Sequence, residues 1–249
     1  MVTLYPSSYQ ELLKRFSIHQ LVSFFISKMN YLTLQLFNTD ELKILKQNLD
    51  NKELPWEDGK QTAGKHAAKV KNNLQLKRDS DLSKKFSRLI TKKILSNELI
   101  KSFALPKKVH GTIFSKSKSG MKYGRHIDNA YMSSGRADLS FTIFLNGKEK
   151  YDGGELSIES FNSEEKFKLS AGEIIIYPST YLHSVEEVLD GERLVFIGWI
   201  ESYVKCIEER EYLFDLDAAA RSLLAKYGRS SEVDLIFKSY SNLLRRLGS

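Results

Sequence analysis

Two histidines and an aspartate have the residue types and spacing of a metal site. His126, Ile127 and Asp128 form an H-x-D motif in a segment whose composition predicts a β-strand. Side chains alternate in direction along a strand, so the His126 imidazole and the Asp128 carboxylate should project from the same face. A second imidazole, from His183, would complete the set of two histidines and one carboxylate that binds Fe(II) in non-haem oxygenases. We therefore predict that His126, Asp128 and His183 are metal ligands.

Arg193 adds a second element to this pattern. It follows His183 in the chain and comes directly after the turn signal Asp190-Gly191 and Glu192. A guanidinium binds a carboxylate through two parallel, charge-assisted hydrogen bonds, which suits the far carboxylate of an iron-bound 2-oxoglutarate. Two alternatives stay open at this point. The H-x-D motif could be a hydrogen-bonded pair on a sheet edge, and Arg193 could be a surface residue paired with Glu192.

The elements that must position these residues read as short strands. From residue 109 to residue 203 the chain consists of runs rich in β-branched and aromatic residues, separated by Gly-containing turn signals such as Asn146-Gly147. The candidate strands are residues 110–115, 123–129, 138–145, 155–159, 165–168, 173–177, 183–188 and 193–199. Short strands in such number, without helical periodicity, predict an antiparallel jelly roll.

Helical periodicity flanks this segment on both sides. Apolar residues recur every three or four positions in 81–103, with lysines and an arginine on the opposite side. Two further helices are predicted at 207–227 and 233–247. The predicted fold class is therefore α+β, with a double-stranded β-helix (jelly-roll, cupin-like) core between N-terminal and C-terminal helical flanks.

Several strings of residues carry a more specific signal. They are YGRHIDNA at 123–130, RADLS at 136–140, FLN at 144–146, YDGGEL at 151–156, AGE at 171–173, YPS at 177–179, HSV at 183–185, GER at 191–193 and WI at 199–200. In these strings the chain closely resembles the PKHD-type hydroxylases, bacterial Fe(II)- and 2-oxoglutarate-dependent dioxygenases related to prolyl 4-hydroxylases. Similar strings at 56–59, 70–75, 212–216 and 242–246 extend the resemblance over residues 30–249.

The resemblance implies roles for particular residues. His126, Asp128 and His183 would bind Fe(II), and Arg193 would bind 2-oxoglutarate. Tyr123 would lie near the cosubstrate and Trp199 would line the pocket against the wall of iron ligands. Core packing is the alternative for both aromatic residues.

The resemblance also implies an activity. It predicts a dioxygenase that consumes 2-oxoglutarate and O2, hydroxylates its substrate and releases succinate and CO2. It further implies L-ascorbate as a cofactor and a link to iron uptake. A peptidyl proline is the substrate by analogy, and a siderophore-like or other small molecule is the alternative. A non-catalytic sensor of iron or 2-oxoglutarate on the same fold is the alternative function.

The charge of the chain is unevenly distributed. The whole chain of 249 residues has a net charge of +7, whereas residues 65–122 hold 16 Lys or Arg and only 3 Asp or Glu. A basic block of this kind favours acidic partners. It lacks a helix-turn-helix or an aromatic-interleaved platform, so we predict no nucleic-acid partner. Because the block ends shortly before His126, we expect it to help acidic small molecules approach the site or to serve solubility alone.

We expect four segments along the chain. They are an N-terminal extension at 1–28, a helical or mixed flank at 29–108, the jelly roll at 109–203 and a C-terminal helical flank at 204–249. Residues 1–28 match nothing in the family, so they are either a genuine extension or the product of a start assigned too early, with Met29 as the true start. The absence of a signal peptide and of a long apolar run predicts a cytoplasmic protein without a membrane partner. The apolar stripes of the helical flanks suggest a homo-oligomer or packing on the barrel.

Overall fold

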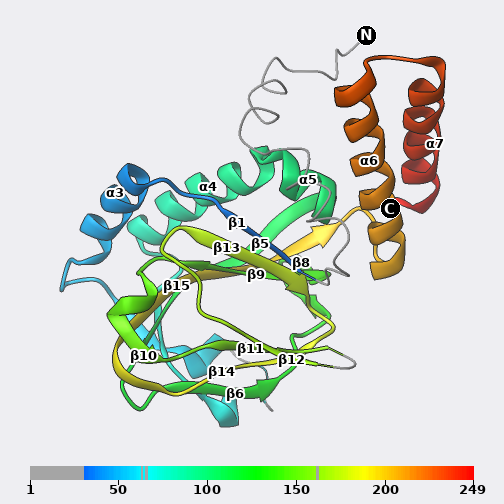
Figure 1. Cartoon of the computed structure of the whole chain (residues 1–249). Coiled ribbons are helices and arrows are strands. Elements are labelled where there is room, and N and C mark those ends of the chain that lie inside the picture. The colour runs from blue at the N-terminus through cyan, green and yellow to red at the C-terminus, as the bar shows by residue number, and fades with distance from the viewer. Residues whose placement is uncertain (1–30, 63, 65–66, 161–162) are drawn as a thin grey trace. The chain divides into compact units, whose positions relative to one another are not determined.

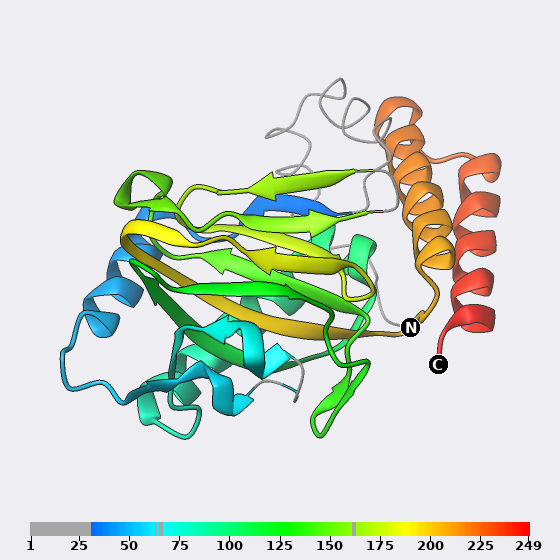
Figure 2. The ribbon, with the colours of Figure 1, turned by 90° about the horizontal axis from the view of Figure 1, so that it is seen from below.

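The computed structural model describes residues 31–62, 64, 67–160 and 163–249. The expectations for residues 1–28 therefore lie outside the described residues. The described chain divides into two compact units, one that ends at Tyr203 and one that runs from Val204 to Ser249. The first unit contains two antiparallel sheets that face one another (Figures 1 and 2).

The larger sheet has the strand order β1–β13–β9–β15–β5–β4–β2, and β10 also pairs with β15. Its strands are β1 (Leu32–Gln35), β2 (Trp56–Asp58), β4 (Leu74–Leu76), β5 (Pro106–Lys118), β9 (Leu139–Phe144), β10 (Tyr151–Gly153), β13 (Glu173–Pro178) and β15 (Val188–Ser202). All residues of β9 are buried. A strand buried on both faces needs this continuous apolar and small-polar composition, because neither face meets water.

The smaller sheet has the order β12–β11–β14–β6–β3. Its strands are β3 (Lys71–Asn72), β6 (Lys122–His126), β11 (Leu156–Glu159), β12 (Glu164–Phe167) and β14 (Leu182–Val185), and a separate two-stranded ribbon is formed by β7 (Tyr131–Met132) and β8 (Gly135–Arg136). A cluster of buried apolar side chains lies between the two sheets and includes Phe144, Leu156, Ile158 and Val195. The predicted jelly roll and the α+β class are confirmed.

Helices cover the outer face of the larger sheet (Figure 1). They are α3 (Thr39–Leu49), α4 (Asp81–Ser96) and α5 (Glu98–Ala104), and short 3₁₀ helices occur at η1 (Gly59–Thr62), η2 (Ala67–Val70) and η3 (Lys148–Lys150). Helix α4 buries Phe86, Ile90 and Ile94, which are spaced four apart and so share one face. The prediction of one continuous helix over 81–103 is wrong. The helix ends at Ser96, and the Asn97 side chain accepts a hydrogen bond from the Ile100 backbone N–H and caps α5.

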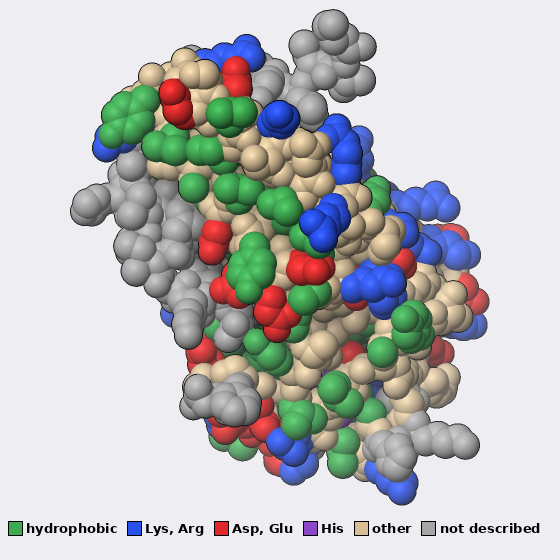
Figure 3. Space-filling view, turned by 90° about the vertical axis from the view of Figure 1, so that its right-hand side faces the viewer, with side chains coloured by type: hydrophobic (Ala, Val, Ile, Leu, Met, Phe, Trp, Pro, Cys, Tyr) green, Lys and Arg blue, Asp and Glu red, His purple; other side chains and the backbone are tan. Residues whose placement is uncertain are grey.

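The second unit is a pair of helices, α6 (Ile207–Tyr227) and α7 (Ser231–Leu247), packed against each other. The chain entering α6 is held by Arg210, whose Nη1 donates to the carbonyl oxygens of Val204 and Lys205 at 2.7 and 2.8 Å. Both helices expose large apolar side chains, namely Tyr212, Leu223, Tyr227, Leu235 and Leu243. In the space-filling view, hydrophobic side chains stand in groups between charged and polar ones (Figure 3). None of the helices described for this chain has both the length and the apolar character of a membrane span.

Candidate metal centre

The smaller sheet brings His126, His183 and Asp128 together. His126 is the last residue of β6 and pairs directly with His183 of β14, so that their ring centroids lie 4.2 Å apart. Asp128 follows two residues after the end of β6, and its Oδ2 lies 3.7 Å from Nε2 of His183. One ligand atom from each of the three residues lies within 4.8 Å of the others. These residues therefore converge on one point, as the sequence predicted.

Asp128 reaches this point although the strand ends earlier than expected. The sequence predicted a strand to residue 129, whereas β6 ends at His126. The in-and-out alternation of side chains nevertheless continues, because Ile127 is 54% exposed while His126 and Asp128 on either side of it are shielded. The common face needed for an H-x-D site is thus maintained beyond the last hydrogen-bonded residue.

Backbone carbonyl groups fix both imidazole rings. Nδ1 of His126 lies 2.8 Å from the carbonyl oxygen of Gly124, and Nδ1 of His183 lies 3.1 Å from that of Tyr181. A carbonyl oxygen only accepts hydrogen bonds, so Nδ1 of each ring donates to it, and Nε2 is the nitrogen left for a metal ligand bond. Partners of this kind are a regular feature of metal-binding histidines.

Two serines support Asp128. The Ser140 hydroxyl donates to Oδ2 of Asp128 at 2.6 Å and lies 2.7 Å from the Ser179 hydroxyl. Because Ser140 has one proton and donates it to the carboxylate, Ser179 must donate to Ser140. Reasoning from the sequence gave these serines no role. Their one signal was that each stands in a string that resembles the hydroxylase family.

The electrostatics of His126 suit a divalent cation. Burial lowers the pKa of His126, and the neighbouring His183 lowers it further. The His126 ring is therefore neutral at pH 7, which is the form that binds metals. Two imidazoles and one carboxylate are the donor set of non-haem Fe(II) sites, so the residues present fit Fe(II).

A cavity of about 430 Å³ adjoins the three residues, and Arg193 lies on its wall. The Arg193 side chain is only 3% exposed, and its Nε has no hydrogen-bond partner in the described part of the chain. None of the described carboxylates forms an ion pair with it, and Glu192 instead pairs with Lys116 at 3.3 Å. The surface-pair alternative for Arg193 is therefore wrong. A guanidinium remains charged even where burial lowers its pKa, so the cavity fits an anion such as 2-oxoglutarate.

Tyr123 and Trp199 also line the cavity. The Tyr123 ring stacks on the His126 ring, with centroids 3.6 Å apart and an angle of 18° between the planes. Burial, and then the charge of Asp128, raise the pKa of the Tyr123 hydroxyl, which therefore stays protonated. Trp199 packs over Gly111, where a Cβ atom would lie 2.6 Å from the indole. Gly111 also has a φ of 63°, so both the space and the backbone require glycine here.

Two basic residues that reasoning from the sequence did not single out line the same cavity, Lys71 of β3 and Arg78. Both belong to the basic block at 65–122, but an excess of charge does not indicate which of its members face inward. His66, which received no role, lies outside the described residues. His110 is buried and hydrogen-bonds to the Ser134 hydroxyl and the Arg136 carbonyl oxygen.

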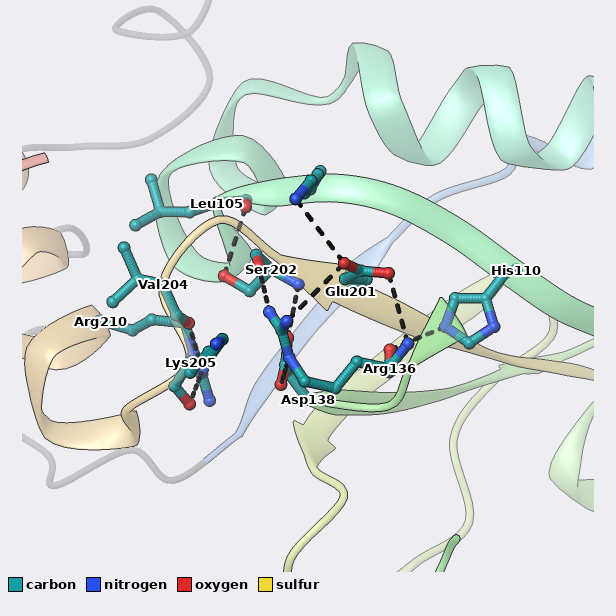
Figure 4. Close-up of polar contacts among 10 residues, drawn as sticks. Leu105, His110, Arg136, Asp138, Glu201, Ser202, Val204, Lys205 and Arg210 are labelled. Carbon is teal, nitrogen blue, oxygen red and sulfur yellow. Dashed lines mark hydrogen bonds and ion pairs between the residues drawn. The ribbon is translucent and has the colours of Figure 1, made fainter. Parts of the chain in front are cut away.

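The β7–β8 ribbon contributes Tyr131 and Met132 to the cavity wall. An ionic network connects this ribbon to the larger sheet (Figure 4). Arg136 donates to Oδ1 of Asp138 at 2.7 Å and to the Ser202 carbonyl oxygen at 2.8 Å. Glu201 lies 3.7 Å from the same guanidinium. The network thus fixes the chain that follows Asp128.

Comparison with known proteins agrees with this geometry. Residues 112–201 match the profile of the 2OG-Fe(II) oxygenase superfamily, and residues 208–248 match the C-terminal domain of PKHD-type hydroxylases. A PKHD-type hydroxylase of Prochlorococcus marinus strain MIT 9215 is 74% identical over 220 residues, which are 88% of this chain and 100% of the relative. A second, from strain MIT 9515, is 69% identical over 221 residues, which are 89% of this chain and 100% of the relative.

Solved structures share the fold at low sequence identity. A Pseudomonas putida prolyl-4-hydroxylase gives a TM-score of 0.51 at 17% identity and covers 73% of this chain and 98% of its own. A Trichoplax adhaerens prolyl hydroxylase was solved with a hypoxia inducible factor peptide. It gives a TM-score of 0.53 at 14% identity, and the match covers 86% of this chain and 97% of that protein. At these identities the two structures support the jelly roll alone. The sequence identity to the Prochlorococcus marinus relatives is much higher. It shows that the chain belongs to the PKHD-type hydroxylases, dioxygenases of the 2OG-Fe(II) oxygenase superfamily.

Proposed function

We propose that His126, Asp128 and His183 bind Fe(II), that Arg193 binds 2-oxoglutarate, and that the enzyme hydroxylates a substrate with release of succinate and CO2. One observation carries the proposal. Three ligand atoms within 4.8 Å of one another lie on the wall of a cavity that also contains a buried guanidinium without a carboxylate partner in the described chain.

The protein's own residues have separate tasks in this proposal. When bound, Fe(II) and 2-oxoglutarate supply the oxidising chemistry, in which O2 is activated as the cosubstrate loses CO2. Ser140 holds the Asp128 carboxylate, and the carbonyl oxygens of Gly124 and Tyr181 hold the imidazoles with Nε2 free. Arg193 would hold the far carboxylate of 2-oxoglutarate.

Tyr123 and Trp199 complete the wall of the proposed site. The Tyr123 ring covers one face of the His126 imidazole and would border the cosubstrate. Trp199 would shield the iron-ligand wall from water. Because the indole packs against Gly111, it is fixed in place on the larger sheet.

Further parts of the proposal rest on the family resemblance. They are L-ascorbate as a cofactor, a link to iron uptake, a peptidyl proline or a siderophore-like small molecule as substrate, a location in the cytoplasm and assembly into a homo-oligomer. The alternative of a non-catalytic sensor is not favoured, because the close relatives are described as hydroxylases.

The proposal is tested by succinate formation. Purified protein with Fe(II), 2-oxoglutarate and O2 should release succinate slowly without substrate, and Asp128→Asn and His183→Ala should abolish this release and the binding of stoichiometric metal. Asp152→Asn, at an exposed position of β10, is the matched control and should retain both. Succinate release without iron, or an unaffected Asp128→Asn variant, would exclude the proposed centre. Tight binding of iron and 2-oxoglutarate without any succinate would instead support the sensor.

A further inference from the structure

We propose that the substrate of this enzyme carries a carboxylate, and that Lys71 and Arg78 bind this carboxylate in the cavity beside the metal centre. The inference rests on the proposed function, because it names the chemistry of the molecule that enters the same cavity. It concerns two cationic side chains that have no role in the proposed binding of iron or of 2-oxoglutarate.

Lys71 is a buried cation with few partners. It lies on β3 opposite Tyr123 of β6, and its side chain is only 5% exposed. Its Nζ donates to Oγ1 of Thr62 at 3.1 Å and lies 5.0 Å from the centroid of the Tyr123 ring. An ammonium group has three donors, and Thr62 is its one hydrogen-bond acceptor in the described chain. No described carboxylate lies within ion-pair distance of it.

The amine remains charged despite its burial. Burial is the main cause that lowers the pKa of Lys71 to about 8, and Arg78 lowers it further, while Asp128 and Asp58 act in the opposite direction. At pH 7 the amine is therefore still mostly protonated. A buried charge without a counter-ion is unfavourable, so an anion that enters the cavity would form a strong ion pair with this amine.

Arg78 places a second positive charge at the same cavity. Arg78 is exposed, and its guanidinium donates to the Gly111 carbonyl oxygen at 3.3 Å. It forms no ion pair with any described carboxylate, although the charge of Glu57 acts against the lowering of its pKa by burial. Two like charges that interact disfavour each other unless an anion lies near both. The pair thus has the composition of a carboxylate site, because Lys71 supplies a compact ammonium charge and Arg78 supplies a planar guanidinium with several N–H donors.

Lys71 and Arg193 reach the cavity from different sheets. Arg193 comes from β15 of the larger sheet, whereas Lys71 comes from β3 of the smaller sheet, next to the strand that carries His126. Two other lysines of the basic block form ion pairs. Lys116 pairs with Glu192 at 3.3 Å, and Lys122 pairs with Glu187 at 3.0 Å. Unlike these two lysines, Lys71 and Arg78 form no ion pair with a described carboxylate.

The test uses small acids, each paired with its neutral amide. Protein loaded with redox-inert Mn(II) and saturated with 2-oxoglutarate, which occupies Arg193, is titrated with N-acetyl-L-proline, hexanoic acid and benzoic acid and with the primary amide of each. Calorimetry gives Kd, and relaxation of the probe protons by Mn(II) shows whether the probe lies near the metal. We expect at least one acid to bind roughly tenfold more tightly than its amide and to be relaxed by the metal.

Variants assign the effect to Lys71. Lys71→Met should remove the preference for the acid, Arg78→Met should reduce it, and Lys71→Arg should retain it. Lys122→Met, which removes an ion-paired lysine from β6, is the control and should leave it unchanged. Thermal unfolding of each variant confirms that it is folded.

Two results would overturn the inference. One is that no acid binds better than its amide at millimolar concentration. The other is that Lys71→Met raises the KM for 2-oxoglutarate in the succinate assay about tenfold, because Lys71 would then serve the cosubstrate. Failure of the proposed function is distinguishable from both, since the wild-type protein would then release no succinate at all, whatever the acids do.

Discussion

His126 and His183 face each other directly across the antiparallel strands β6 and β14. The pairing of these two strands therefore sets the distance between the two proposed nitrogen ligands. A slip of one residue would turn His183 to the opposite face of the sheet, so the register is as important to the centre as the residue types. Asp128 differs, because it lies beyond the end of β6 and no ladder hydrogen bond fixes it. Its position depends on a side chain from the other sheet, Ser140 of β9.

Ser140→Ala should therefore weaken metal binding without unfolding the protein. The substitution removes the 2.6 Å hydrogen bond to Oδ2 of Asp128 and leaves the carboxylate free to rotate. Loss of such a supporting group typically lowers metal affinity about 10- to 100-fold. The affinity can be measured by competition titration with Mn(II) and a fluorescent chelator.

Ser179→Ala provides the comparison for Ser140. Ser179 contacts Ser140 rather than Asp128, so its replacement should have a smaller effect on affinity. The KM for 2-oxoglutarate should change little in both variants, because neither serine contacts Arg193. Equal losses in both variants, or no loss in Ser140→Ala, would show that Ser140 does not position the carboxylate.

Arg193→Met should abolish the stabilisation that 2-oxoglutarate gives to the protein. Removing one partner of a buried charge pair costs roughly 2–5 kcal/mol, which corresponds to a rise in Kd of at least about 30-fold. Without 2-oxoglutarate the variant should be as stable as the wild type or more so, because the substitution removes a buried charge that lacks a counter-ion in the described chain.

The measurement is Tm with and without the cosubstrate in the presence of Mn(II). Arg125→Met is the control, because Arg125 forms an exposed ion pair with Glu159. A normal shift of Tm by 2-oxoglutarate in Arg193→Met would place the cosubstrate elsewhere.

The eight strands predicted within 109–203 overlap strands of the jelly roll, because runs of β-branched and aromatic residues between Gly-containing turns are local signals. Helix boundaries are predicted less well. The apolar spacing of 81–103 continues past Asn97, and nothing in that spacing shows that the Asn97 side chain caps a new helix. The H-x-D motif is also local, and one strand suffices to predict its common face.

Lys71 shows the limit of such reasoning. Its inward position follows from the pairing of β3 with β6, which brings it opposite Tyr123. Such pairing is between segments far apart in the sequence, and the pattern around residue 71 contains no sign of it. Ser140 is a similar case, because its contact with Asp128 joins the two sheets.

Arg136→Met should destabilise the protein markedly. Asp138, whose side chain is 7% exposed, and Glu201 would lose the guanidinium that lies between them. Breaking a buried ion pair by removing one partner costs about 3–5 kcal/mol. Urea unfolding measures the loss. Arg125→Met, which breaks an exposed pair, should cost no more than about 1 kcal/mol. Similar losses in the two variants would mean that burial does not strengthen the network of Figure 4.

The buried amine of Lys71 should make the stability of the metal-free protein depend on alkaline pH. Its pKa is lowered from 10.5 to about 8 in the folded state, mainly by burial. Between these values the unfolded chain binds a proton that the folded protein has released, so the free energy of unfolding rises with pH across this window. Because one pKa unit corresponds to about 1.4 kcal/mol, the rise should amount to roughly 3 kcal/mol.

Lys71→Met should remove this rise. Other lysines and tyrosines titrate in the same pH range, but they do so in both proteins, so the difference between the wild type and the variant isolates Lys71. The difference in unfolding free energy should be largest below pH 8, where the variant is more stable because the buried charge is absent. It should shrink towards pH 10.5, where the wild-type amine is neutral in the folded state. Lys122→Met removes an exposed lysine and should show no such trend. A constant difference between the wild type and Lys71→Met would mean that the Lys71 amine is not held as a buried cation.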